Sequence, residues 1–219
     1  MYDLQKIYLD IRPEIEQRYE TFKTIWELGD NEIFPELIFC FCTPQTNAKY
    51  GWNAVKSLLQ LGYLKTPILD EEKTLNEISE ILSQSGVRFK KNKSKYIVNA
   101  IKNFNSGNGF KNFINNLISN NNIIETRNWL AENMYGIGMK EASHFLRNIG
   151  LGDEISILDR HILRCLVEYK VINKTPKSMS KKAYLNIEQQ MKEFSKQINI
   201  SMFELDFVFW YKAKNELFK

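Results

Sequence analysis

The sequence predicts an all-α protein. Three observations indicate this fold class: apolar residues recur at helical spacing along nearly all of the chain, glycine, proline and short polar runs separate those stretches, and no clear run of alternating polar and apolar residues is present. The hydrophobic fraction of 43% and the aromatic fraction of 13% are sufficient for a substantial core.

The N-terminal part contains three predicted helices. Residues 14–26 have apolar or aromatic side chains on one face, and residues 32–42 are strongly apolar, as expected for a buried helix. Thr43 followed by Pro44 is typical of a helix N-cap with proline at the first helical position, so we expect the third helix to begin there and to end at Gly62.

Glycines and polar loops divide the rest of the chain into further helices. An amphipathic helix ends at Gly86. The basic run at residues 88–95 is a candidate for phosphate contacts, although such a run is usually only a solvated face. Residues 105–109 form a loop, residues 181–197 form an amphipathic helix, and Ser201 caps the last helix.

Composition excludes several classes of protein. Three cysteines without a framework argue against a disulfide-stapled secreted fold, and Cys40 and Cys42 lie in an apolar segment typical of a core. Because His144 and His161 are the only histidines, we expect no metal site. No apolar run is long enough to span a membrane and no secretory signal is visible, so we expect a cytoplasmic protein. The net charge of +4 permits nucleic-acid binding without demanding it.

The segment Gly136-Ile137-Gly138 lies between two predicted helices. Glycine permits a tight hairpin and removes side chains from the turn, so that backbone N–H groups at the start of the second helix point outward and favour a phosphate. We therefore expect Gly136, Gly138 and Met139 to bind phosphate groups. An ordinary helical corner with a glycine cap explains the hairpin, taken alone, equally well.

A lysine and an aspartate after the hairpin are the candidate catalytic residues. Lys140 lies two positions after Gly138, and Asp159 follows 19 positions later at the start of the next helix, where it also fits the role of N-cap. A lysine amine can attack C1′ of a nucleotide and form a Schiff base. A carboxylate can stabilise the positive charge that develops on the sugar and help to manage the lysine proton.

This chain resembles the type 2 8-oxoguanine DNA glycosylase/AP lyase family of archaea and some bacteria, which belongs to the helix-hairpin-helix DNA glycosylases. The separation of Lys140 and Asp159 is that of the bifunctional members. The resemblance covers most of the chain, at residues 42–48, 135–148, 159–164 and 209–212 and at the terminal Lys219.

We expect two helical subdomains with the active cleft between them. Residues 30–138 form a central subdomain that ends in the hairpin, and residues 1–29 combine with residues 139–219 in the second. No cysteine follows Cys165, so the four-cysteine iron–sulfur loop of endonuclease III-type relatives is excluded, and we expect no cofactor.

The resemblance implies a DNA repair enzyme that excises 8-oxoguanine from double-stranded DNA. The damaged base is flipped into a pocket, Lys140 attacks C1′, and the Schiff base leads to strand cleavage by β-elimination. DNA that contains an abasic site is then a second substrate. We expect a monomer that associates with the nucleoid while it acts on DNA.

Five further residues are candidates for base recognition. Trp210 matches an aromatic position that packs on the lesion in the family, with core packing as the alternative, and Tyr96 is a candidate for the opposite face of the base. Gln45 is a candidate for an edge contact, with plain solvation as the alternative. Asp206 lies among apolar residues, so it either contacts the base or pairs with a lysine. In the family, the carboxylate of the terminal lysine, here Lys219, helps to distinguish 8-oxoguanine from guanine.

Two other functions stay open at this point. One is a related glycosylase that acts on a different lesion, and the other is a non-catalytic helix-hairpin-helix DNA-binding module. Such a module needs no lysine and aspartate at this spacing, so Lys140 and Asp159 favour an enzyme.

Overall fold

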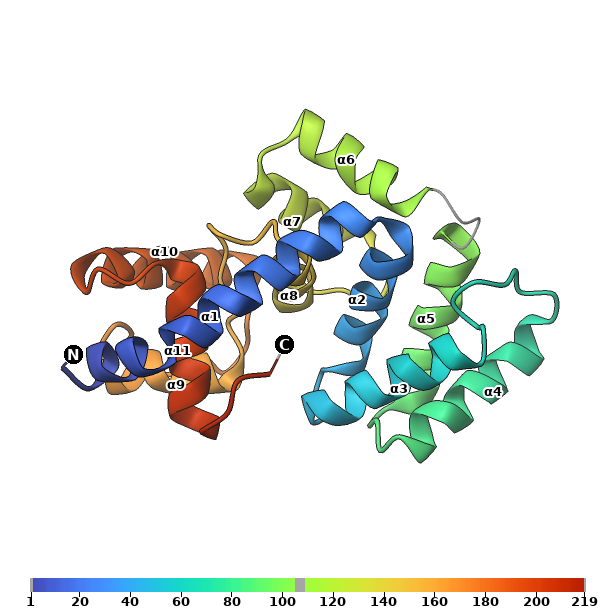
Figure 1. Cartoon of the computed structure of the whole chain (residues 1–219), viewed down its shortest axis with the longest axis horizontal. Helices are drawn as coiled ribbons and strands as arrows, with labels where there is room; N and C mark the ends of the chain where they lie inside the picture. Colours follow the sequence, from blue (N-terminus) through green and yellow to red (C-terminus); the bar gives the residue numbers. More distant parts are fainter. Residues whose placement is uncertain (1, 105–108, 219) are drawn as a thin grey trace. The chain divides into compact units, whose positions relative to one another are not determined.

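The computed structural model describes residues 2–104 and 109–218, and the regular structure in this part of the chain is helical (Figure 1). These residues contain eleven α-helices and no β-strand. The all-α prediction is therefore confirmed.

The helices form two compact units. One unit contains residues 25–138 together with Phe218, and the other contains residues 2–24 and 139–217. The division passes through the first helix, α1 (Tyr2–Leu28), and through the glycine hairpin. We propose these units as the two subdomains expected from the sequence.

In the unit of residues 25–138, a buried helix forms much of the core. The helices here are α2 (Asp30–Cys42), α3 (Ala48–Gln60), α4 (Glu71–Gln84), α5 (Lys90–Phe104), α6 (Phe110–Asn120) and α7 (Ile123–Asn133). Helix α2 is buried from Ile33 to Cys42 and packs on α3, α5 and α6, which confirms the predicted buried helix. Cys40 and Cys42 belong to this core, as expected.

The other unit has its last helix in the core. Besides α1, it contains α8 (Met139–Asn148), α9 (Arg160–Glu168), α10 (Lys181–Gln197) and α11 (Met202–Lys214). Helix α11 packs on both α9 and α10. Its Phe203 and Phe207 both contact Phe22 of α1, with ring centroids 6.3 Å apart in each pair. Because α11 is buried on several sides, residues on it are held firmly relative to α9.

Several local predictions are confirmed. Helix α10 spans the predicted residues, and Ser201 caps α11 in a reciprocal capping box with Glu204. Gly62 and Gly86 follow α3 and α4 with φ of 80° and 77°, a conformation that glycine adopts without steric cost.

The start of α3 differs from the prediction. Thr43 is the C-terminal cap of α2, and α3 begins only at Ala48, where the Asn47 side chain accepts a backbone hydrogen bond of 2.9 Å. Residues 44–46 form a turn in which Gln45 has φ of 54°. The prediction was wrong because a Thr-Pro pair suits a turn as well as a helix start.

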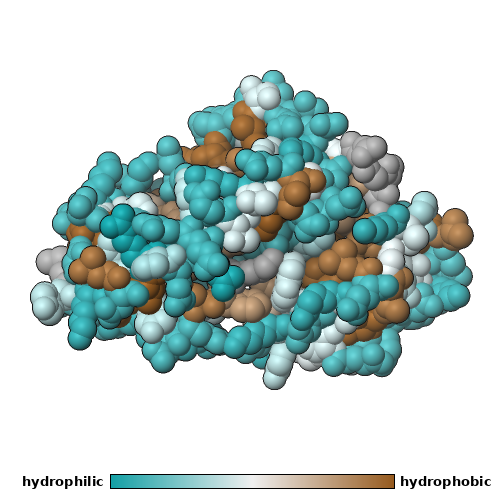
Figure 2. Space-filling view, in the orientation of Figure 1, coloured by the Kyte–Doolittle hydropathy of each residue, from teal (hydrophilic) through white to brown (hydrophobic). Residues whose placement is uncertain are grey.

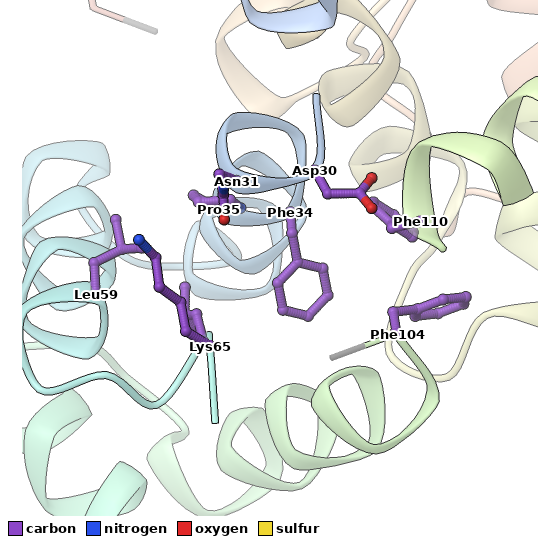
Figure 3. Close-up of a pocket in the computed structure, with 9 residues that line it drawn as sticks. Asp30, Asn31, Phe34, Pro35, Leu59, Lys65, Phe104 and Phe110 are labelled. Atoms are coloured by element: carbon purple, nitrogen blue, oxygen red, sulfur yellow. The ribbon is translucent and has the colours of Figure 1, made fainter. Parts of the chain in front are cut away.

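The face of the molecule in Figure 2 is mostly polar, and the unit of residues 25–138 contains a small pocket. The face drawn in Figure 2 is mostly hydrophilic with scattered apolar patches, and no helix among the described residues is long and apolar enough to cross a membrane. A pocket of about 140 Å³ is lined by the aromatic rings of Phe34, Phe104 and Phe110 (Figure 3). None of the candidate site residues lines it.

Candidate active site

The predicted hairpin joins α7 to α8. Helix α7 ends at Asn133, and Met134 caps it by donating its N–H to Leu130. Gly136 has φ of 88°, Ile137 is buried beneath the turn, and α8 begins at Met139. The first N–H groups of α8 follow directly after the turn, where the helix dipole favours an anion.

Tyr96 packs against the hairpin glycine. A Cβ atom added to Gly136 would lie 2.3 Å from Cγ of Tyr96, so the ring covers the position that a side chain would occupy. The same ring makes an edge contact with Tyr135, at 4.9 Å between centroids, and a tilted contact with Phe41 at 6.0 Å. Tyr96 therefore supports the hairpin, a role that the sequence did not indicate.

We expect Gly136→Ala to destabilise the protein by more than Gly29→Ala does. Both glycines have positive φ, but a Cβ at Gly29 meets nothing within 4 Å. Gly29→Ala, the control, should lower the free energy of unfolding only through backbone strain, by about 1–3 kcal/mol. Gly136→Ala should lower it by the same strain and by a further amount of about 1–3 kcal/mol, because the new methyl group overlaps the Tyr96 ring. Denaturant unfolding measures both. Adding Tyr96→Ala should recover part of the excess, and equal losses at the two glycines would show that the ring moves away without cost.

Lys140 lies in the first turn of α8. Its side chain is 22% exposed, and its Nζ is 3.9 Å from Oε1 of Glu141. The amine is thus partly sheltered yet open to a ligand, as a nucleophile requires.

Asp159 caps α9, as predicted. Its Oδ1 accepts hydrogen bonds from the backbone N–H groups of His161, at 2.7 Å, and Ile162, at 2.9 Å. Among the described residues no hydrogen bond is formed by Oδ2. The capping role therefore leaves one carboxylate oxygen available for other chemistry.

The loop between Lys140 and Asp159 packs closely on α8. A Cβ on Gly152 would lie 2.4 Å from Cα of Arg147, so only glycine permits this approach. Helix α10 holds the segment before Asp159 in place through hydrogen bonds to Ser156. The Tyr184 hydroxyl donates to the Ser156 carbonyl at 2.6 Å, and the Glu188 carboxylate accepts from the Ser156 N–H at 2.8 Å. These contacts fix where Asp159 begins α9.

Asp206 of α11 forms a buried ion pair with Arg147 of α8. Its Oδ2 pairs with Arg147 at 2.5 Å, so its partner is an arginine rather than the lysine considered from the sequence. Burial raises the pKa of Asp206 to about 6, against the opposing charge of Arg147. The charge of Asp159 raises this pKa further, and the charge of Lys140 lowers it.

Trp210 lies one helical turn beyond Asp206, on the same face of α11. Its ring makes an edge contact with His161 at 5.5 Å, and burial lowers the pKa of that histidine, which favours a neutral imidazole. Among the described residues, Nε1 of Trp210 and Oδ1 of Asp206 are both buried without a hydrogen-bond partner. An unpaired buried donor and an unpaired buried acceptor are costly, and such a pair is typical of a site that binds a polar ligand.

The structure brings only some of the candidates together. Lys140, Asp159, Asp206 and Trp210 belong to the unit of residues 139–217, whereas Gln45 and Tyr96 belong to the other unit. Gln45 is exposed in its turn. Lys219 lies outside the described residues.

The sequence placed Tyr184 on the inward face of its helix but did not indicate that it positions the segment before Asp159. The burial of Arg147 and Glu188 was missed, because these residue types are usually exposed. The one available signal for Glu188 was its position on the apolar face of an otherwise polar helix, next to Ile187 and Met191.

Comparisons with known proteins agree on one family. A family model described as 8-oxoguanine DNA glycosylase matches residues 15–200. The chain is 40% identical to the 8-oxoguanine DNA glycosylase/AP lyase of Fusobacterium nucleatum over 99% of this chain and 96% of that protein.

Two crystal structures have the same fold as this chain. The 8-oxoguanine DNA glycosylase of Thermotoga maritima is 32% identical, with a TM-score of 0.84 over 100% of this chain and 97% of that one. The Methanocaldococcus jannaschii 8-oxoguanine glycosylase/lyase, in complex with a 15mer DNA containing 8-oxoguanine, is 34% identical, with a TM-score of 0.83 and complete coverage of both chains.

Proposed function

The chain belongs to the 8-oxoguanine DNA glycosylase family, and from this membership we propose that it excises 8-oxoguanine from duplex DNA as a bifunctional DNA glycosylase and AP lyase. The observation that carries the proposal is the placement of Lys140 in the first turn of the helix that follows the glycine hairpin, with Asp159 as the cap of the next helix.

Lys140 is the nucleophile in this mechanism. Its neutral amine forms a bond to C1′ while the bond from C1′ to the base breaks, and the base leaves with the bonding electrons. Loss of the lysine proton and opening of the sugar give a Schiff base. Removal of a proton from C2′ then breaks the bond between C3′ and its phosphate oxygen, which cleaves the strand. The Asp159 carboxylate stabilises positive charge on the sugar and accepts the lysine proton.

Base recognition follows the flipping of the lesion out of the helix. The unpaired Oδ1 of Asp206 and Nε1 of Trp210 support contacts with a polar edge of the base, and the Trp210 ring supplies a stacking surface. Gln45 and Tyr96 are further candidates in the other unit. The backbone N–H groups of Gly136, Gly138 and Met139 bind a DNA phosphate.

The expected partners follow from this chemistry. Duplex DNA with 8-oxoguanine and DNA with an abasic site are both substrates, because the lyase step needs only the sugar. We expect the protein to act as a monomer, in the cytoplasm and at the nucleoid.

Borohydride trapping tests the proposed function. Borohydride reduces a Schiff base to a stable amine, so duplex DNA with one 8-oxoguanine should become covalently attached to the protein. Duplexes with guanine or with an oxidised pyrimidine at the same position serve as controls. Trapping with the pyrimidine alone would indicate a glycosylase for another lesion, and binding without trapping on any duplex would indicate a non-catalytic DNA-binding module.

Removal of Lys219 should lower the selectivity for 8-oxoguanine over guanine without stopping strand cleavage at an abasic site. The deletion moves the terminal carboxylate to Phe218, a displacement of up to about 3.5 Å along the chain, which a hydrogen bond does not survive. Selectivity for 8-oxoguanine over guanine should fall by about ten- to hundredfold, as expected for one lost hydrogen bond to a charged group.

Cleavage of a preformed abasic site should persist in the deletion variant, because that substrate has no base to recognise. Lys219→Ala is the matched control, since it keeps the terminal carboxylate in place. Unchanged selectivity after deletion would refute the role of the carboxylate, and equal loss of every activity would indicate damage to the packing of α11.

A further inference from the structure

Lys93 is a buried lysine that the proposed mechanism does not use. It lies in α5 and is only 3% exposed, although it belongs to the basic run for which the sequence suggested either phosphate contacts or a solvated face. Its ammonium group donates hydrogen bonds to the carbonyls of Cys42, at 2.9 Å, and Pro44, at 2.8 Å, and to Oγ1 of Thr46 at 3.1 Å. An ammonium group has three donors and no acceptor, so a buried lysine needs oxygen partners of this kind.

Two residues near these contacts have unusual backbone conformations. Gln45 has φ of 54° and Phe89 has φ of 59°, a region that side chains other than glycine, asparagine and aspartate rarely adopt. Both are exposed, and Phe89 is 52% exposed despite its apolar ring. Backbone strain of this kind persists where surrounding contacts impose it, and it concentrates at functional sites.

Lys93 connects the two strained residues. We call residues 43–47 the Gln45 turn and residues 86–89 the Phe89 turn. The Lys93 ammonium donates to Pro44 and Thr46 of the Gln45 turn. The Lys93 backbone N–H donates to the Phe89 carbonyl of the Phe89 turn at 3.1 Å. Oγ1 of Thr46 also accepts from the Arg88 N–H at 3.1 Å, which bonds one turn directly to the other.

The exposed side chains of the two turns have the chemistry of a nucleic-acid contact. Phe89 presents an aromatic face for stacking on a base, and Gln45 presents an amide for a base edge. The exposed guanidinium of Arg88 lies 5.5 Å from the Phe89 ring and supplies a positive charge for a phosphate.

We propose that Lys93 is a positioning residue that holds the Gln45 turn and the Phe89 turn together in the strained conformation that contacts duplex DNA and keeps the target base unstacked. This inference rests on the proposed function. Lys93 itself touches no DNA in this arrangement, and its effect passes through Gln45 and Phe89.

Lys93→Met and Thr46→Val are the test variants. Methionine keeps much of the length of lysine and removes all three donors, whereas valine has nearly the shape of threonine and removes only the oxygen that Lys93 and Arg88 share. Lys102→Met is the matched control, because Lys102 is an exposed lysine of the same helix and lies outside the basic run at residues 88–95. Each change is made in a Lys140→Gln background, so that DNA is bound and not consumed.

Unstacking is measured by the fluorescence of 2-aminopurine placed beside 8-oxoguanine in the duplex, at saturating protein. The fluorescence rise seen with Lys140→Gln alone should fall by a factor of at least about three with Lys93→Met and to a lesser extent with Thr46→Val, because the unstacked population decreases. Lys102→Met should keep the full rise. Circular dichroism at the assay temperature establishes that each variant is folded. If Lys93 only stabilised the fold, a folded variant would show the same fluorescence rise as Lys140→Gln alone.

A full fluorescence rise in folded Lys93→Met overturns the inference. If Lys93→Met is unfolded at the assay temperature, the result with Thr46→Val is used instead. A full fluorescence rise with folded Thr46→Val also overturns the inference. Failure of the proposed function is distinguishable, because the wild-type protein would then excise no 8-oxoguanine, whatever the fluorescence of the variants.

Discussion

Lys140→Gln is expected to abolish both excision of 8-oxoguanine and borohydride trapping. Glutamine has no amine that can form a Schiff base, so the covalent route through C1′ is lost and the excision rate should fall by at least about three orders of magnitude. Single-turnover excision and trapping on the same duplex measure the two losses. Stability should change little, because the side chain is partly exposed and a long ion pair such as that to Glu141, at 3.9 Å, contributes little.

DNA binding should persist in this variant, because the hairpin N–H groups are untouched. Lys177→Gln, at an exposed lysine in the same unit, is the matched control and should excise at the wild-type rate. A Lys140→Gln protein that is still trapped by borohydride would show that a different amine is the nucleophile.

Asp159→Asn is expected to reduce catalysis strongly while leaving the fold intact. Asparagine caps helices about as well as aspartate, so the two hydrogen bonds to His161 and Ile162 should remain and the free energy of unfolding should change by less than about 0.5 kcal/mol. The variant loses the negative charge that stabilises the developing sugar cation. Excision should therefore slow by about two to three orders of magnitude.

Asp70→Asn separates the capping role from the catalytic role. Asp70 caps α4 in the same manner, accepting from the Lys73 N–H at 3.0 Å, and has no proposed part in the reaction. It should retain both stability and activity. If Asp159→Asn also excised at the wild-type rate, Asp159 would be a helix cap only.

Much of the fold could be predicted because the signals that set it are local. Helical periodicity located α10 and the buried α2, Ser201 marked the start of α11, and Gly62 and Gly86 marked the ends of two helices. Capping hydrogen bonds and positive φ angles depend on neighbouring residues, so they can be predicted from short stretches of sequence. The hairpin and the spacing of Lys140 and Asp159 are local in the same sense.

The turn at Gln45 shows where local signals are insufficient. Thr43 and Pro44 suit two conformations, and the contact that distinguishes them comes from Lys93, which is 51 positions from Cys42. The apolar stripe of α5, which includes Ile97 and Ile101, places Lys93 on the buried face when it is extended back by one turn. Burial of Lys93 was nevertheless not expected from the sequence, because lysine is rarely buried unless it has partners.

The sequence by itself determined that this protein is helical, where most of its helices lie, and which lysine and aspartate are the candidates for catalysis. Only the tertiary structure decided which side chains hold them in place. The Arg147 to Asp206 pair spans 59 positions, and the hydrogen bond from Tyr184 to Ser156 spans 28. A buried polar group is stable only when packing brings a hydrogen-bond partner to it. In both of these contacts the partner lies far away in the sequence, so the residues next to the buried group do not predict it.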